Sequence, residues 1–112
     1  MIDISEGVLL FNDCDFFSAH DFFEEIWMDS SSSEKEFFQG LVQISVGLYH
    51  LICGNLKGAK SQLTKGKVKL EKFPSNYCKI NNVKLIKDIS ILLMNLDKEN
   101  IINHIPKIKL TN

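Results

Sequence analysis

The chain has 112 residues, of which 45% are hydrophobic and 24% are charged, and its formal net charge is −1. That length fits a single domain with one core, and no apolar run approaches the roughly 18 residues that a membrane-spanning helix needs. The three cysteines are odd in number and far apart, which fits neither a disulfide framework nor a CxxC metal or redox motif. We expect reduced thiols, with Cys14 and Cys53 facing the core.

Charge is distributed unevenly along the chain. Residues 1–50 hold ten carboxylates and one lysine, whereas residues 51–112 hold twelve lysines and four carboxylates. The two halves can neutralise each other within one molecule, or between copies in a homo-oligomer. A nucleic-acid-binding face is disfavoured because all thirteen cations are lysine, so no arginine is present to read guanine or phosphate with paired hydrogen bonds.

The N-terminal residues lack the basic region and the small-residue cleavage site of a secretory signal. We therefore expect a cytoplasmic protein with no membrane association.

Hydrophobic periodicity and helix breakers predict an all-α fold, a compact bundle of about five helices built from two helical hairpins plus a C-terminal helix. The expected helices cover about residues 3–12, 15–28, 33–53, 56–72 and 83–96. Ser33, with Glu36 three residues later, predicts a capping box at the start of the third helix. We expect residues 1–98 to form a single helical domain and residues 99–112 to form a C-terminal tail that is partly ordered.

The two hairpins share a pattern at an offset of 40 residues, which aligns residues 15–19 with residues 55–59. In each segment Asp15 or Asn55 can cap the following helix, and Ala19 or Ala59 lets the paired helices approach closely. This pattern indicates a packing solution used twice within a bundle rather than an open solenoid.

Polar side chains interrupt the apolar faces of the second and third helices. On the second helix, His20 and Glu24 share a face with Trp27 and several phenylalanines. On the third helix, three glycines at seven-residue spacing accompany the polar residues, and they indicate close helix approach or room for a ligand. If the two faces meet, they form a candidate binding groove lined by His20, Glu24, Trp27, Gln39, Gln43 and His50.

Three interpretations of this groove stay open. The polar residues can form a buried hydrogen-bond network that orients the hairpins, because an unpaired buried polar group costs about 1–3 kcal/mol. They can instead line a site for a small molecule or a protein segment. As an alternative, His20, Glu24 and His50 can bind a divalent metal in a metal-assisted hydrolase-like enzyme. We predict a non-enzymatic binding or interaction module without a cofactor.

A known family shows similar blocks of residues in the same order. The blocks are Phe16-x-x-Ala19-His20-x-x-x-Glu24-x-x-Trp27, then Phe38-Gln39-Gly40-Leu41-x-Gln43, then Tyr49-His50, and finally Gly54-Asn55-x-x-Gly58-Ala59. Over about residues 8–72 the chain resembles the family called domain of unknown function 309. The resemblance implies a small all-helical protein, found in bacteria, archaea and some plastids, so a plastid stroma is the alternative to the cytoplasm.

The resemblance marks certain positions without giving them a chemical role, because the family has no established biochemical activity. These family-type positions are His20, Glu24, Trp27, Gln39, Gly40, Gln43, His50, Asn55 and Gly58. The usual family pattern has glutamate directly after the histidine, whereas this chain has Asp21. That difference weakens a metalloenzyme interpretation that depends on this carboxylate.

Overall fold

A computed structural model describes residues 2–111 of the chain. Over these residues the chain forms α1 (Ser5–Asn12), α2 (Phe16–Asp29), α3 (Ser32–Ile52), α4 (Leu56–Leu70) and α5 (Asn82–Met94), with two short 3-10 helices, η1 (Tyr77–Lys79) and η2 (Ile101–His104). The all-α class, with two helical hairpins followed by a C-terminal helix, is confirmed. Among the described helices, none combines the length and the apolar composition needed to cross a membrane.

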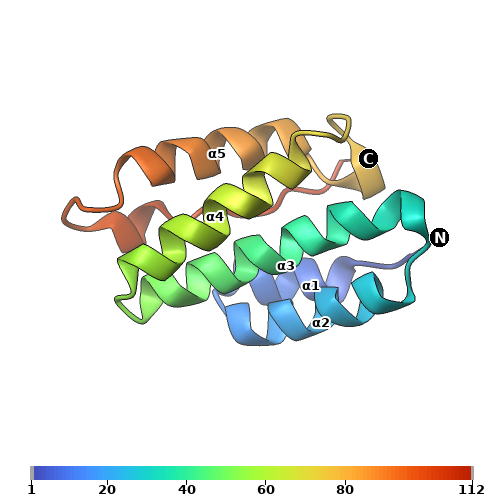
Figure 1. Cartoon of the computed structure of the whole chain (residues 1–112), viewed down its shortest axis with the longest axis horizontal. Helices are drawn as coiled ribbons and strands as arrows, with labels where there is room; N and C mark the ends of the chain where they lie inside the picture. The colour runs from blue at the N-terminus through green and yellow to red at the C-terminus, as the bar shows by residue number, and fades with distance from the viewer. Residues whose placement is uncertain (1, 112) are drawn as a thin grey trace.

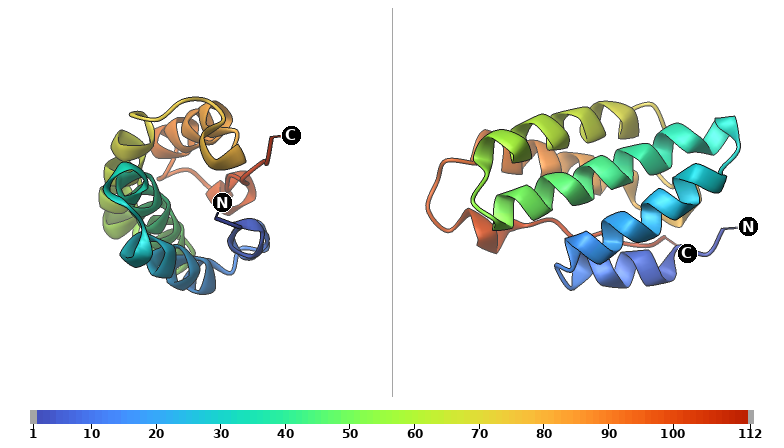
Figure 2. Two further views of the ribbon diagram at one scale, coloured as in Figure 1. Left: turned by 90° about the vertical axis from the view of Figure 1, so that its right-hand side faces the viewer. Right: turned by 60° about the horizontal axis from the view of Figure 1, so that its bottom comes forward.

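Each helix packs mainly against its neighbours in sequence, and α3 lies at the centre between α2 and α4 (Figure 1). Viewed along the long axis, the five helices form an arc from α1 to α5 (Figure 2). The segment that follows α5 runs back through the opening of this arc, between α5 and α1. The molecule measures 40 × 24 × 22 Å.

The two hairpin turns are built in the same way, as the offset of 40 residues predicts. The side chain of Asp15 accepts a hydrogen bond from the amide of Ser18 at 3.3 Å, which caps the N-terminus of α2. The side chain of Asn55 accepts one from the amide of Gly58 at 2.9 Å, which caps α4. Both predicted caps are therefore confirmed, and each satisfies one backbone donor that the helix itself leaves unpaired.

The predicted capping box at Ser33 is wrong. α3 begins before Ser33, at Ser32, so the Ser33 hydroxyl lies inside the first turn, where it pairs with the Ser31 hydroxyl at 3.0 Å. Glu36 does not reach back to the helix start, because its carboxylate accepts a hydrogen bond from Lys72 of the neighbouring chain segment at 3.0 Å. A tertiary ion pair thus replaces the expected local motif.

The prediction that Cys14 and Cys53 face the core is also wrong, since both are exposed. Cys14 lies in the turn between α1 and α2, and Cys53 is the residue that ends α3. The helical periodicity that would direct a side chain inward stops at these turns.

The glycines of α3 allow close packing against α4. A Cβ atom added at Gly47 would lie 2.7 Å from Cγ of Leu63, and one at Gly40 would lie 3.3 Å from the carbonyl oxygen of Gly66. On α4, a Cβ atom at Gly66 would lie 2.8 Å from the carbonyl oxygen of Gly40. Gly40 and Gly47 therefore provide close helix approach, one of the two roles that the spacing indicates, whereas the third glycine, Gly54, lies in the turn after α3, where an added Cβ atom would meet nothing within 4 Å.

Candidate functional site

His20 lies on α2 between two carboxylates. Its Nε2 atom is 3.1 Å from the Glu24 carboxylate, one helical turn away, and its Nδ1 atom is 3.2 Å from the Asp21 carboxylate. The same Nδ1 atom is 3.3 Å from the carbonyl oxygen of Phe17. The His20 side chain is 24% exposed, so this is a partly solvated cluster at the surface of α2.

The other predicted groove residues lie in different surroundings. Gln43 faces α4, where its Oε1 atom accepts a hydrogen bond from the Lys69 ammonium at 2.9 Å. His50 lies at the turn into α4, where its Nδ1 atom is 3.4 Å from the side-chain nitrogen of Asn55. Trp27 and Gln39 are partly buried, and Trp27 packs against the core. Among the six predicted groove residues, an N···O contact within 4 Å joins His20 and Glu24.

Aromatic rings connect the two histidines across α2 and α3. The ring centroids of Phe17 and His20 are 5.8 Å apart, those of Phe17 and Tyr49 are 5.9 Å apart, and those of Tyr49 and His50 are 6.5 Å apart. We call these four residues the aromatic–histidine patch. Phe17 is 57% exposed and Tyr49 is 42% exposed, so the two central rings of the patch face solvent.

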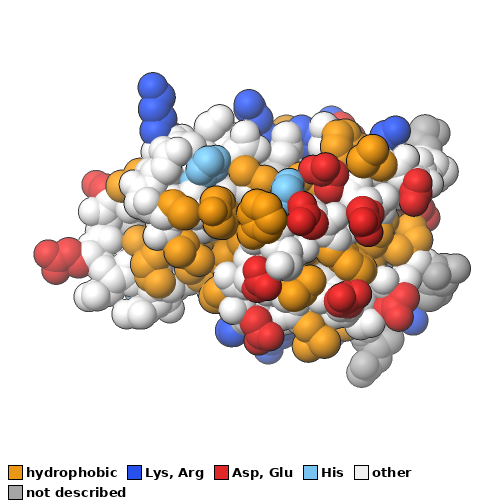
Figure 3. All heavy atoms as spheres, turned by 90° about the horizontal axis from the view of Figure 1, so that it is seen from below, with side chains coloured by type: hydrophobic (Ala, Val, Ile, Leu, Met, Phe, Trp, Pro, Cys, Tyr) orange, Lys and Arg blue, Asp and Glu red, His pale blue; other side chains and the backbone are white. Residues whose placement is uncertain are grey.

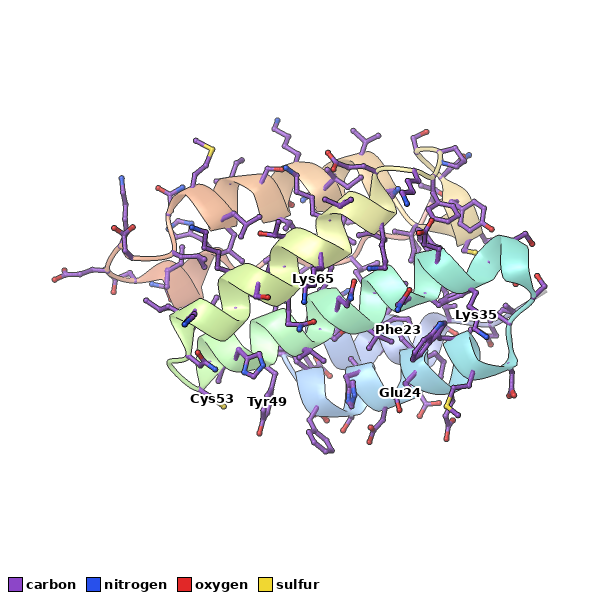
Figure 4. The ribbon with its side chains drawn as sticks, in the orientation of Figure 1. Phe23, Glu24, Lys35, Tyr49, Cys53 and Lys65 are labelled. Carbon is purple, nitrogen blue, oxygen red and sulfur yellow. The ribbon has the colours of Figure 1, made fainter. Side chains whose placement is uncertain are left out.

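Apolar and acidic side chains surround this patch. Beyond Tyr49, exposed apolar residues at the end of α3 and the start of α4 include Ile52, Cys53 and Leu56, and Asn55 and Lys57 beside them are exposed too. Figure 3 shows hydrophobic side chains in a band across one face of the molecule, with histidine beside the band and carboxylates gathered on one side. In Figure 4, Tyr49 and Cys53 project from α3 toward the same edge of the molecule. The face is therefore apolar at its centre and acidic at one margin.

Neither Phe17 nor Tyr49 was among the groove residues predicted from the sequence. Each of these aromatic residues follows a buried one directly, Phe16 or Leu48, and consecutive positions on a helix point about 100° apart. That order alone does not mark them as exposed, because Phe38 follows the buried Phe37 and is itself buried. The exposure of Phe17 and Tyr49 depends instead on how their helices pack.

Metal binding needs at least three suitable side chains that converge on one point. Within residues 2–111, no group of three or more His, Cys, Asp and Glu side chains has the arrangement that could hold a metal ion. His20 and Glu24 are adjacent, whereas His50 pairs with Asn55 instead. The expectation that the protein needs no cofactor stays a prediction.

A cavity of about 590 Å³ lies away from the patch, where the two ends of the chain meet. Its walls come from residues 2–5, from η1 and from residues 110–111, and none of the six predicted groove residues lines it. Burial raises the pKa of the Cys78 thiol in this wall, and the nearby Glu34 carboxylate adds to the effect. Cys78 is therefore a weak nucleophile at neutral pH.

The fold and the surface define a small all-helical protein of two capped hairpins and a closing helix, with an exposed aromatic and histidine-bearing face. A family model described as a domain of unknown function (DUF309) matches residues 4–62, and the chain belongs to this family. The matched region spans α1 to α3 and the first part of α4, so it contains the whole aromatic–histidine patch. No curated protein matches the chain.

Proposed function

We propose that the protein is a non-enzymatic interaction module that binds a segment of a partner protein through the aromatic–histidine patch. The observation that carries the proposal is the contact between Phe17 and Tyr49, whose rings meet across two helices at 5.9 Å while both stay widely exposed. Aromatic side chains are enriched at the energetic centres of protein interfaces. Exposed clusters of them on a soluble protein commonly mark such interfaces.

The charge beside the patch indicates the chemistry of the partner. Asp21 and Glu24 flank His20, and their side chains are 62% and 42% exposed. Carboxylates at the margin of an interface steer oppositely charged partners and disfavour acidic ones. A lysine or arginine of the partner can also stack on the face of Phe17 or Tyr49. We therefore infer that the partner's segment is basic and carries at least one apolar side chain that packs against the patch.

The wide exposure of Phe17 and Tyr49 favours a protein segment over a small molecule, because small-molecule sites are concave and bury most of their ligand. The cavity of about 590 Å³ lies at residues outside the patch. A metal-assisted hydrolase that uses His20, Glu24 and His50 has less support, because His50 pairs with Asn55 at the turn into α4. The lysines of α4 in a second copy of the chain offer one basic surface of the required kind.

Selection from a displayed library of random peptides tests this proposal without a known partner. We expect the selected peptides to combine lysine or arginine with an apolar residue. They should lose at least about tenfold in affinity for the double variant Phe17→Ala/Tyr49→Ala, since truncating interface hot spots costs about 2 kcal/mol or more.

The matched control is the double variant Val83→Ala/Ile91→Ala, which removes two exposed apolar side chains from α5. We expect it to bind the selected peptides like the unmodified protein. Peptides that bind the Phe17→Ala/Tyr49→Ala variant with undiminished affinity would show that the patch is not the interface. A selection that enriches no basic peptides would contradict the inferred partner chemistry.

A further inference from the structure

The C-terminal segment runs between α1 and α5 (Figure 2) and is held there by Asn12 on one edge and by residues 79–81 on the other. We call the site that it fills the groove, and none of the residues of the aromatic–histidine patch forms these bonds. Along residues 105–109, Pro106 and Ile108 are buried whereas Lys107 and Lys109 are exposed. This alternation is the pattern of an extended chain with one face against the protein. Ile108 is 2% exposed and joins the hydrophobic core, so it anchors the segment.

Asn12, the last residue of α1, holds this segment by its backbone. The Asn12 side-chain nitrogen donates to the carbonyl oxygen of Ile108 at 2.9 Å, and the Asn12 side-chain oxygen accepts from the Ile108 amide at 2.8 Å. These paired bonds use main-chain groups of the segment, so they recognise an extended chain whatever its side chains. They join residues 96 positions apart in sequence.

A lysine adds a contact that depends on charge. The Lys107 ammonium donates to the carbonyl oxygen of Asn12 at 2.9 Å. The last carbonyl groups of a helix lack partners within the helix, and the helix dipole makes this end attractive to cations. The groove therefore favours lysine directly before the buried apolar residue.

The opposite edge of the segment pairs with the chain after η1. Ile80 and Leu110 form an antiparallel β-bridge. The amide of Asn81 donates to the carbonyl oxygen of Lys109 at 2.7 Å, and the amide of Thr111 donates to the carbonyl oxygen of Lys79 at 2.6 Å. Addition of an extended chain along an existing backbone edge is a recurring way in which proteins bind peptides.

We propose that this groove is a docking site for an extended peptide, and that the chain's own residues 105–111 occupy it as a displaceable internal ligand. The external ligand is a partner segment in which lysines alternate with buried apolar residues, as in residues 106–109. Because the internal segment is tethered, its effective concentration is high and an external segment must compete with it. Release of the segment opens the site.

Hydrogen exchange on the unmodified protein tests whether the segment opens independently. The amides of Ile108 and Thr111 are bonded to Asn12 and Lys79, and the amide of Leu48 lies in the buried centre of α3. We expect the first two amides to exchange at least about tenfold faster than that of Leu48, through an opening smaller than global unfolding. Equal protection of all three amides would overturn the proposal.

A labelled peptide of residues 101–111 then tests binding to the groove. The full-length Ile108→Asp variant should release its own segment and bind the peptide at least about tenfold more tightly than the unmodified protein does. The matched control is Ile102→Asp, which places the same charge at a side chain that is 49% exposed, and it should leave the groove occupied. Adding Asn12→Ala to Ile108→Asp should abolish peptide binding.

Fluorescence anisotropy measures the binding, and circular dichroism checks that each variant folds. A folded Ile108→Asp variant that binds the peptide no better than Ile102→Asp would overturn the proposal. Failure of Ile108→Asp to fold would also overturn it, because the segment would then be an inseparable part of the core.

Discussion

Cys14 and Gly54 occupy equivalent positions in the two hairpin turns, and both have a left-handed backbone, with φ of 62° and 81°. In each turn the amide of the next residue, Asp15 or Asn55, donates to the carbonyl oxygen five residues earlier, at 2.9 and 2.8 Å. This closure is the Schellman arrangement, whose left-handed position glycine fills most readily. The first turn therefore uses a side-chain-bearing residue in a conformation that favours glycine.

Replacing Cys14 with glycine should stabilise the protein. The Cys14 side chain is exposed, so little packing is lost, while the left-handed strain is relieved. We expect a gain of about 0.5–1 kcal/mol in the free energy of unfolding and a rise of a few degrees in melting temperature. Thermal and urea denaturation measure the change.

Gly54→Ala is the matched control for this prediction. A Cβ atom at Gly54 would have no atom within 4 Å, so the substitution adds strain without a steric clash. We expect it to lower stability by about 1 kcal/mol. If Cys14→Gly lowers the free energy of unfolding as much as Gly54→Ala does, the left-handed backbone at Cys14 does not strain the first turn, and the prediction is wrong.

Gly66→Ala should destabilise the contact between α3 and α4. The added Cβ atom would lie 2.8 Å from the carbonyl oxygen of Gly40, a backbone atom that cannot rotate away. The cost of forcing the helices apart, about 1–3 kcal/mol, exceeds the helix propensity of about 1 kcal/mol that alanine gains over glycine. Urea denaturation of Gly66→Ala and of the exposed control Thr64→Ala on the same helix separates the two effects. Equal stability of the two variants would mean that the helices can separate at little cost.

The parts of the fold that depend on local patterns were predictable from sequence. The caps at Asp15 and Asn55 and the close approach at Gly47 depend on residue types within a few positions. The capping box at Ser33 failed because Glu36 finds Lys72, a partner that local sequence does not reveal.

The candidate surface was less predictable, for a related physical reason. A histidine and a carboxylate one helical turn apart must be neighbours, so His20 and Glu24 could be paired from sequence. The contact between Phe17 and Tyr49 depends on how α2 and α3 are rotated against each other. The bonds from Asn12 to Ile108 connect distant parts of the chain, and no local pattern marks them.

The three cysteines should react with thiol reagents at two distinct rates. Cys14 and Cys53 are exposed, whereas Cys78 is partly buried and its pKa is raised by burial. Because the thiolate is the reactive form, we expect Cys78 to react at least about tenfold more slowly at pH 7.5. Intact-mass spectrometry after maleimide labelling counts the modified thiols over time. In denaturant all three should react together, and uniform rates in the folded protein would contradict the prediction.

Purified, untagged protein should contain no stoichiometric transition metal. Among the described residues no three His, Cys, Asp and Glu side chains are arranged to hold a metal ion, and Asp21 and Glu24 contact different nitrogens of the His20 ring. Elemental analysis, together with thermal melts with and without zinc, manganese or nickel, checks this. His20→Ala should change stability by at most about 1 kcal/mol, because the contacts with Asp21 and Glu24 that it removes are partly exposed. Stoichiometric metal that disappears in His20→Ala would instead support the hydrolase interpretation.

Self-association through opposite charges should depend strongly on salt. Ten of the fourteen carboxylates lie in residues 1–50, and twelve of the thirteen lysines lie in residues 51–112. Sedimentation velocity should therefore show association at an ionic strength of about 10 mM and a monomer at about 1 M, where charges more than about 3 Å apart are screened.

The double variant Lys60→Glu/Lys65→Glu reverses two exposed charges on α4 and should remain monomeric at both ionic strengths. Thr64→Ala, on the same helix, should associate like the unmodified protein, because it changes no charge. Association that survives about 1 M salt would indicate contact through apolar side chains instead, since burial of apolar surface is not weakened by screening. The Phe17→Ala/Tyr49→Ala variant would then identify the patch as the contact if it alone dissociates.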